Sequence, residues 1–221
     1  MNLPDQLFPQ IWYWAGYLAF VPLLAREAWR APWGRLRDPA QLNCWLGAVV
    51  SLLVLWQIQA AIKPGITFHF LGATILTLMF GPRLALVGLT LVVAATSLWG
   101  AGDWQGFGLN GLTMAAIPVA VSYSLYRLIE DRLPNHLFVY IFLTAFAGAA
   151  AAVATVGVVT VTLLASAGTY PAGQLFDFYL PYYLLLAWSE AVLTGMAMTL
   201  FVVYKPEWVA TFDDRRYLRN K

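Results

Sequence analysis

The sequence predicts an all-α, polytopic membrane protein, and three observations lead there: the composition, the length of the apolar runs and the placement of basic residues. Hydrophobic residues make up 61% of the 221 residues and charged residues only 11%, whereas an ordinary soluble domain is about 25% charged. One soluble core of this size cannot hide so much apolar side chain. We therefore expect much of the surface to face membrane lipid.

Apolar runs of nearly the length that crosses the hydrocarbon core, about 20 residues, give seven predicted spans. They are residues 11–25, 42–62, 66–81, 84–101, 107–128, 137–167 and 178–204. Helices are expected because lipid offers backbone groups no other hydrogen-bond partners, and the alternating pattern of a membrane barrel is absent from the sequence. We assign residues 1–204 to a seven-helix transmembrane domain and residues 205–221 to a cytoplasmic C-terminal tail.

Each span has its own boundary signal. The stretch before the first span, MNLPDQLFPQ, lacks the basic region of a signal peptide, so the first span is expected to be retained. Proline and glycine at 64–65 and 81–82 separate the second, third and fourth spans, and Leu133-Pro134 precedes the sixth. The small residues of the sixth span, AFAGAAAAVATVG, favour close helix packing. The tail is expected to be solvated, with docking to a cytoplasmic partner as the alternative.

Basic residues set the predicted orientation. When successive loops are assigned alternately to the two sides, twelve of the thirteen fall on one side, and only Lys63 falls on the other. The twelve are Arg26, Arg30, Arg35, Arg37, Arg83, Arg127, Arg132, Lys205, Arg215, Arg216, Arg219 and Lys221. Positive charge collects on the cytoplasmic side of membrane proteins. The N-terminus is therefore predicted outside and the C-terminus in the cytoplasm, in the inner (cytoplasmic) membrane of the cell.

His69 stands out at the head of an otherwise apolar segment, TFHFLGATILTLMFGP. The predicted third span is short, about 24 Å at 1.5 Å per residue, and short spans often border a polar cavity. If Thr67 caps this helix, the helix dipole keeps the imidazole neutral, which is its metal-ligating form. A structural, hydrogen-bonded histidine is the alternative, although ionisable groups within a membrane are functional candidates.

Several motifs share order and spacing with a known family. They are HFLGA at 69–73, FGP at 80–82, GAGD at 100–103, GLN at 108–110, MNLPDQLFP at 1–9 and SEAVLTG at 189–195. Together they resemble the CbiM-like family, the metal-capturing membrane subunits, or permeases, of energy-coupling-factor nickel and cobalt transporters. The resemblance implies uptake of a divalent transition-metal ion with a transmembrane coupling subunit and ATPase subunits.

The resemblance also implies a metal site near the outer face. In the family the ion is held by the N-terminal amine, by the backbone nitrogen and imidazole of the second residue, and by a histidine of the third helix. By position, these ligands correspond to Met1, Asn2 and His69. Asn2 stands where the family has histidine, so one nitrogen donor for square-planar Ni(II) is missing. Either another residue completes the site, or the chain keeps the scaffold without binding an ion.

Three further residues are candidates for the ion path or for supporting the ligands, each with a plainer role beside it. Asp103 offers a carboxylate in an outer loop or serves as a turn residue. Asn110 orients His69 or caps the fifth helix. Glu190 lines an ion path or contacts a coupling subunit, or it is a protonated side chain bonded to Ser189, Thr194 or a neighbouring helix.

The remaining possible donors are assigned to packing or to the interface. Met79 and Met114 carry thioethers that suit copper(I), but packing is the usual role of methionine in a membrane helix. His136 is expected at the cytoplasmic end of the sixth span, at the interface, and the single Cys44 is expected to be a structural thiol.

Other function classes find little support in the sequence. It contains no P-loop, GxSxG or HExxH motif, so we expect neither an enzyme nor a nucleotide site in this chain. Basic and aromatic residues between Arg26 and Arg37 indicate contact with lipid headgroups and not with nucleic acid. Two alternatives stay open: a non-transporting accessory or assembly subunit of a larger complex, and capture of an organic substrate such as a vitamin in an aromatic pocket near Trp104 and Phe107.

Overall fold

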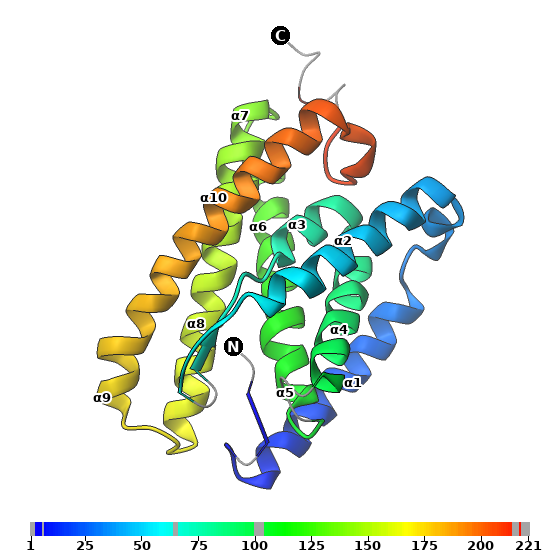
Figure 1. Ribbon diagram of the computed structural model, residues 1–221. Helices are drawn as coiled ribbons and strands as arrows, with labels where there is room; N and C mark the ends of the chain where they lie inside the picture. Colours follow the sequence, from blue (N-terminus) through cyan, green and yellow to red (C-terminus); the bar gives the residue numbers. More distant parts are fainter. Residues whose placement is uncertain (1–2, 6, 64–65, 100–103, 214–216, 218–221) are drawn as a thin grey trace.

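The chain folds into an elongated bundle of helices with one short hairpin (Figure 1). The computed structural model describes residues 3–5, 7–63, 66–99, 104–213 and 217. The helices are α1 (Gln10–Trp29), α2 (Pro39–Gln57), α3 (Ala73–Phe80), α4 (Pro82–Leu98), α5 (Phe107–Gly111), α6 (Ile117–Arg132), α7 (Leu137–Val139), α8 (Gly148–Ser166), α9 (Ala172–Gln174) and α10 (Leu180–Tyr204). Short 3₁₀ helices occur at Trp33–Arg37 and Pro206–Trp208.

Three of these helical stretches are longer than their separate labels suggest. Short π-helical segments at Leu112–Ala116, Tyr140–Ala147 and Leu175–Tyr179 join α5 to α6, α7 to α8 and α9 to α10. The resulting continuous helices are Phe107–Arg132, Leu137–Ser166 and Ala172–Tyr204. Together with Pro39–Gln57, they are the four described helices that are long and apolar enough to cross a membrane, and Pro82–Leu98 is a shorter apolar helix.

The predicted third helix is wrong in its first half. Residues Ile66–Phe68 form strand β2, which pairs antiparallel with β1 (Ala60–Lys63), so that Thr67 lies opposite Ala61. The helix begins only at Ala73. The preceding Gly72 has a φ of +65°, a left-handed conformation that is not part of a regular α-helix and that glycine adopts readily. Thr67 therefore does not cap it. The end of the second predicted span is also wrong, because residues from Ala60 onward belong to β1.

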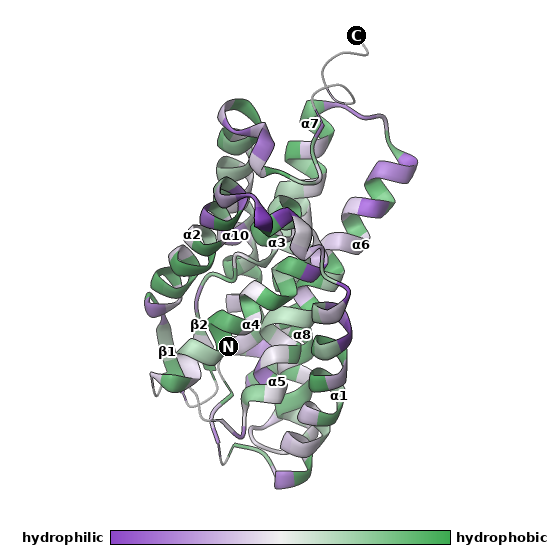
Figure 2. Ribbon diagram, turned by 90° about the vertical axis from the view of Figure 1, so that its right-hand side faces the viewer, coloured by the Kyte–Doolittle hydropathy of each residue, from purple (hydrophilic) through white to green (hydrophobic). Residues whose placement is uncertain are grey.

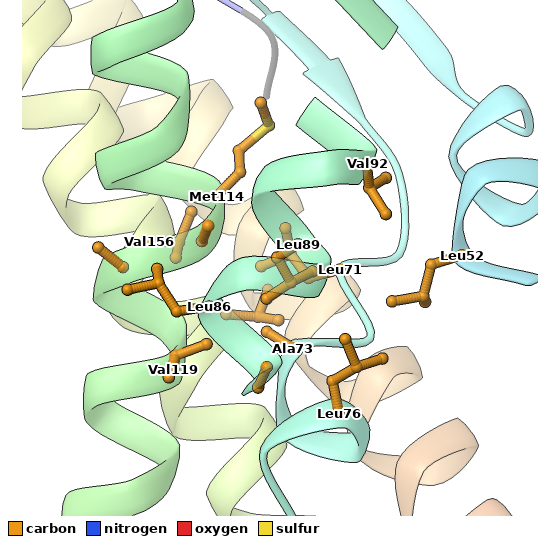
Figure 3. Close-up of a cluster of buried hydrophobic side chains, with 14 of the residues drawn as sticks. Leu52, Leu71, Ala73, Leu76, Leu86, Leu89, Val92, Met114, Val119 and Val156 are labelled. Carbon is orange, nitrogen blue, oxygen red and sulfur yellow. The ribbon is translucent and has the colours of Figure 1, made fainter. Parts of the chain in front are cut away.

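The short helix α3 lies in the middle of the core. Seven of its eight residues are buried, and α4, α6 and α10 pack around it. Figure 3 shows Ala73 and Leu76 of this helix among Leu86 and Leu89 of α4 and Val119 of α6. The helix that follows the His69 segment is thus enclosed by three other helices of the bundle.

Close helix crossings depend on glycine. At Gly108 of α5, an added Cβ would lie 2.5 Å from the backbone nitrogen of Tyr17 in α1, and one at Gly16 would lie 2.8 Å from the backbone nitrogen of Leu109. These neighbours are backbone atoms, which cannot move aside as a flexible side chain can. The two glycines therefore allow α1 and α5 to touch backbone to backbone.

The outer surface agrees with a membrane location. Large apolar side chains of α10 are exposed, among them Leu185 at 66%, Trp188 at 65% and Met196 at 63%. In Figure 2, hydrophobic residues dominate the middle of the helices, and strongly hydrophilic stretches gather at the end where α6 stops. An apolar surface of this extent would be unfavourable in water, so the exposed faces are suited to lipid.

Candidate functional site

His69 lies between β2 and α3 and is almost completely enclosed, with 2% of its surface exposed. Its ring packs against the ring of Trp56 from α2, with 4.5 Å between centroids. The Nδ1 atom lies 3.0 Å from the carbonyl oxygen of Phe70. Because a carbonyl only accepts hydrogen bonds, Nδ1 carries the proton, and the lone pair of a neutral ring is on Nε2. That Nε2 atom is buried and has no hydrogen-bond partner among the described residues.

The segment that carries His69 is held by bonds from two other helices. The indole nitrogen of Trp56 donates to the carbonyl of Leu71 at 3.2 Å. On α10, the carboxylate of Glu190 accepts from the backbone N–H groups of Leu71 at 2.9 Å and Gly72 at 2.6 Å. A carboxylate is favourable here because the N-terminus of α3 has unpaired N–H groups and a positive dipole end. Glu190 thus caps the N-terminus of α3, although it lies more than a hundred residues later in the sequence.

The contacts of Glu190 match one of its predicted roles, a hydrogen bond to a neighbouring part of the bundle. The donors are the backbone N–H groups of Leu71 and Gly72 and not a side chain. Glu190 is 1% exposed, and both of its oxygens accept hydrogen bonds. An ionised carboxylate, which is an acceptor only, suits two N–H donors. Its direct neighbours are the residues just after His69, so it fixes the course of the chain at that point.

Asn110 connects the start of the chain to the core. Its Oδ1 accepts from the N–H of Leu3 at 2.8 Å, and its Nδ2 donates to the C=O of Leu3 at 3.2 Å. Leu3 itself is fully buried. The side-chain amide therefore pairs with the backbone of Leu3 as a neighbouring strand would. It is not used to cap α5, whose N-terminus has no side-chain cap.

The other described residues of the N-terminal segment are also bound to the bundle. Asp5 accepts from the backbone N–H of Gly106 at 2.9 Å. The hydroxyl of Tyr13 donates to the carbonyl of Pro4 at 2.8 Å, and Thr169 donates to the carbonyl of Leu7 at 3.0 Å. These bonds come from α1, from the start of α5 and from the turn after α8. The beginning of the chain is therefore folded back against the helices.

The remaining candidates divide into three groups. Met1, Asn2 and Asp103 lie outside the described residues. Met79 and Met114 are buried in the hydrophobic core, as the packing interpretation predicts. His136 caps α7 by accepting from the N–H of Phe138 at 3.1 Å. Within the described ranges, no three His, Cys, Asp or Glu residues gather in a way that could hold a metal ion.

Trp56 is the residue of this site that the sequence did not reveal. Trp56 lies at the end of α2 and is only 3% exposed. A tryptophan at the end of an apolar helix needs a partner for its indole N–H when it is buried. That requirement was the available signal, although it could not identify Leu71 as the acceptor.

The aromatic pocket expected near Trp104 and Phe107 for an organic substrate is present in part, because only Trp104 lines a groove there. A groove of about 330 Å³ is lined by Gln10, Tyr13, Trp14, Tyr17, Trp104 and Gln105. Phe107 does not line it and packs instead against Phe20, with 5.9 Å between ring centroids. The groove is thus on the outside of α1, whereas His69 is enclosed in the bundle.

Comparison with known proteins agrees with this fold. The protein is 36% identical over 85 residues to a probable fused nickel transport protein LarMN of Lactiplantibacillus plantarum. That match takes in 38% of this chain and 26% of the relative, so the chain spans about a quarter of the curated protein it matches. Two crystal structures of transition metal transporters, one of them truncated, share the fold at 21% identity, with TM-scores of 0.80 and 0.79. They cover 92% of this chain and 99% and 93% of their own.

A family model extends the agreement over almost the whole sequence. It matches residues 2–208 and describes the CbiM family, the cobalt uptake substrate-specific transmembrane region. The resemblance seen in the motifs is therefore confirmed, and so is the expectation that the chain is not an enzyme, because the family and the structural neighbours are transporters. A membrane location with several crossings follows from the same match. The chain belongs to the CbiM family, the cobalt uptake substrate-specific transmembrane region.

Proposed function

We propose that this chain is the substrate-capture subunit, or permease, of an energy-coupling-factor type transporter that takes up a divalent transition-metal ion. The observation that supports it most is the buried Nε2 of His69, which has no hydrogen-bond partner in the part of the chain that the structure describes, in a family whose model describes cobalt uptake. A buried polar atom without a partner is unfavourable by about 1–3 kcal/mol. An arriving metal ion would supply the missing interaction.

The ion would be held by His69 together with the amine of Met1 and donor atoms of Asn2. Leu3 is tied to Asn110 and limits where the first residues can lie, because consecutive Cα atoms are about 3.8 Å apart and the amine of Met1 is then within about 9 Å of Leu3. Asp103 is the carboxylate candidate that could complete the set. Asn110 and Glu190 would act as positioning residues, the first for the N-terminal ligands and the second for the His69 segment.

The proposed donors favour a particular class of ion. Imidazole and amine nitrogens suit cobalt, nickel, copper and zinc, whereas magnesium and calcium prefer oxygen ligands. The name of the fused nickel transport relative supports nickel, and the family description supports cobalt. With Asn2 in place of a second imidazole, an oxygen donor would enter the set, which weakens the preference for square-planar Ni(II).

The proposed topology has seven crossings in the inner membrane, with residues 1–204 in the membrane domain. The N-terminus would be outside, and residues 205–221 would be on the cytoplasmic side. An ion pair joins Arg83 to Glu27, and Arg35 donates to the carbonyl of Trp208. These contacts bring together separate chain segments that carry basic residues, which supports a single basic side. A transmembrane coupling subunit and ATPase subunits would supply the energy, so that ATP is bound by those partners.

Metal titration of the purified protein in nanodiscs, by isothermal calorimetry with Co²⁺ and Ni²⁺, tests the proposal. The protein needs its own N-terminus, because an extension would move the amine. We expect one ion per chain in the wild type, and at least a hundredfold weaker binding after His69→Ala, as about 3 kcal/mol corresponds to that factor. His136→Ala is the matched control and should bind normally.

Two further results separate the alternatives. Addition of Gly-Ser before Met1 should also weaken binding, because the amine would no longer reach the ion. Unchanged binding in His69→Ala and in the extended protein would remove the proposed site. A wild type that binds neither metal would contradict capture and favour the accessory or assembly subunit.

A further inference from the structure

Helix α3 is connected at its far end to the C-terminal segment, which we define as residues 205–213. The helix is eight residues long, about 12 Å at 1.5 Å per residue. An isolated helix of this length is not stable in water, and its last four carbonyl groups have no partner within the helix. The groups that bind its two ends therefore decide where it lies.

The carbonyls at the C-terminal end of α3 are bound by the C-terminal segment and by one arginine. Leu78 O accepts from the backbone N–H of Thr211 at 3.2 Å and from its hydroxyl at 2.9 Å. Met79 O accepts from the N–H of Ala210 at 2.9 Å and from the guanidinium of Arg35 at 3.0 Å. Residues 210–211 thus continue the hydrogen bonding of α3 after its own chain has turned away.

Thr211 is held in turn by a residue of the core. Its hydroxyl lies 2.7 Å from the hydroxyl of Tyr140, which is fully buried. Because the single proton of Thr211 is donated to Leu78, the proton in this bond comes from Tyr140. The ring of Phe212 packs edge-on against Tyr140, with 5.1 Å between centroids. The expected solvated tail is therefore wrong for this part of the chain, where Val209 and Phe212 are buried.

The other end of α3 carries the candidate ligand. Glu190 binds the N–H groups of Leu71 and Gly72, two and three residues after His69. The side of α3 is joined to α6 by the hydroxyls of Thr74 and Ser122, which are 2.7 Å apart. One short, buried helix thus has the His69 segment at one end and the C-terminal segment at the other.

We propose that Thr211 is a positioning residue for the His69 segment, acting through α3 as a rigid strut. Loss of its hydroxyl leaves Leu78 O with the backbone N–H of Thr211 as its remaining donor from this segment, and it takes away the acceptor of Tyr140. The end of α3 is then held less firmly, so that α3 can shift along its axis. Such a shift lengthens the bonds from Glu190 to Leu71 and Gly72 and changes where His69 points. The inference rests on the proposed function only for metal binding by His69. The connection from Thr211 through α3 to the His69 segment does not depend on it.

The test is hydrogen exchange of the Leu71 and Gly72 amides in the metal-free protein, in nanodiscs. The variant is Thr211→Val, which keeps the shape and removes the hydroxyl. We expect these two amides to exchange about fivefold faster or more, since 1 kcal/mol corresponds to about that factor. The matched control is Thr162→Val, because Thr162 is exposed on α8 and, among the described residues, its hydroxyl bonds only Val158 of the same helix. Amides of the α8 core serve as the internal reference.

Two further variants make the result specific. Thr211→Ser restores the hydroxyl and should return the exchange to the wild-type rate. Tyr140→Phe, which removes only the donor to Thr211, should give a smaller effect in the same direction, and it serves if Thr211→Val does not fold. Faster exchange limited to Ala210 and Thr211, with Leu71 and Gly72 unchanged, would overturn the inference.

Metal titration of the same variants connects the strut to the site. Thr211→Val should bind the ion about threefold to tenfold more weakly than the wild type, whereas Thr162→Val should not differ. Normal affinity in Thr211→Val, despite faster exchange at Leu71 and Gly72, would contradict the positioning role. If the wild type binds no ion, the proposed function fails, and the exchange comparison still decides whether the strut exists.

Discussion

Asn110 holds the backbone of Leu3 through both atoms of its side-chain amide, accepting from the N–H at 2.8 Å and donating to the C=O at 3.2 Å. This pair joins the start of the chain to the middle of the sequence inside the bundle. Both residues are buried, at 1% and 0% exposure, so water does not compete for the bonds. The arrangement gives the N-terminal residues a fixed entry into the core.

Asn110→Ala should release the start of the chain. The substitution leaves the N–H and C=O of Leu3 unpaired in the core, which costs about 1–3 kcal/mol for each group. We expect lower thermal stability in detergent and faster exchange of the Leu3 amide. Asn43→Ala, on the exposed side of α2, is the matched control. If the Leu3 amide stays as protected as in the wild type, the pairing with Asn110 does not hold the segment.

Glu190→Gln should weaken the cap of α3 without changing the size of the side chain. A glutamine has one acceptor oxygen, so its NH₂ group would face the N–H of Leu71 or Gly72. We expect a loss of about 1–3 kcal/mol in stability and weaker metal binding. The measurements are denaturant unfolding and metal titration, with Glu207→Gln, an exposed residue of the 3₁₀ helix Pro206–Trp208, as the control. Equal stability of Glu190→Gln and the control would contradict the cap.

Gly72→Ala should be much more disruptive than the same change at Gly168. Both glycines have positive φ, +65° and +70°, so each pays a similar backbone strain of about 1–2 kcal/mol when it becomes alanine. At Gly72 the new Cβ would also lie 2.2 Å from Cδ2 of Leu52, whereas a Cβ added at Gly168 would meet no neighbouring atom within 4 Å. The midpoints of thermal unfolding should therefore differ clearly.

The contact at Gly72 can be tested further with a second substitution. Leu52→Ala removes the side chain that a Cβ at Gly72 would strike. The double variant should lose less stability than the sum of the two single variants, because neighbouring substitutions couple. Additive losses would show that the contact with Leu52 does not explain the role of Gly72.

The sequence predicted most of the long helices because their signal is local. Apolar runs placed α1, α4, α10 and the continuous helix Leu137–Ser166 within several residues of their observed bounds. The third predicted helix failed because its start depends on distant residues. Apolarity alone does not distinguish a helix from the extended chain of Ile66–Phe68, and the cap from Glu190 comes from a residue far along the chain.

The sequence predicted which residues belong to the candidate site, but it did not predict which groups they contact. His69, Asn110 and Glu190 were singled out because polar groups in an apolar run need partners. The partners themselves, such as Leu3 for Asn110, are backbone groups, and a residue's backbone offers the same N–H and C=O whatever its side chain. No pattern in the sequence could therefore identify them. The docking of residues 209–212 was missed for the same reason, since its acceptors are the carbonyls of Leu78 and Met79.

The most direct test of the central claim is anomalous diffraction from crystals of the wild-type protein, grown with its own N-terminus and Co²⁺, at the cobalt absorption edge. The proposal predicts one peak about 2.1 Å from Nε2 of His69, the usual length of a metal–imidazole bond. A bound cobalt ion elsewhere, with Nε2 of His69 still unliganded, would contradict it.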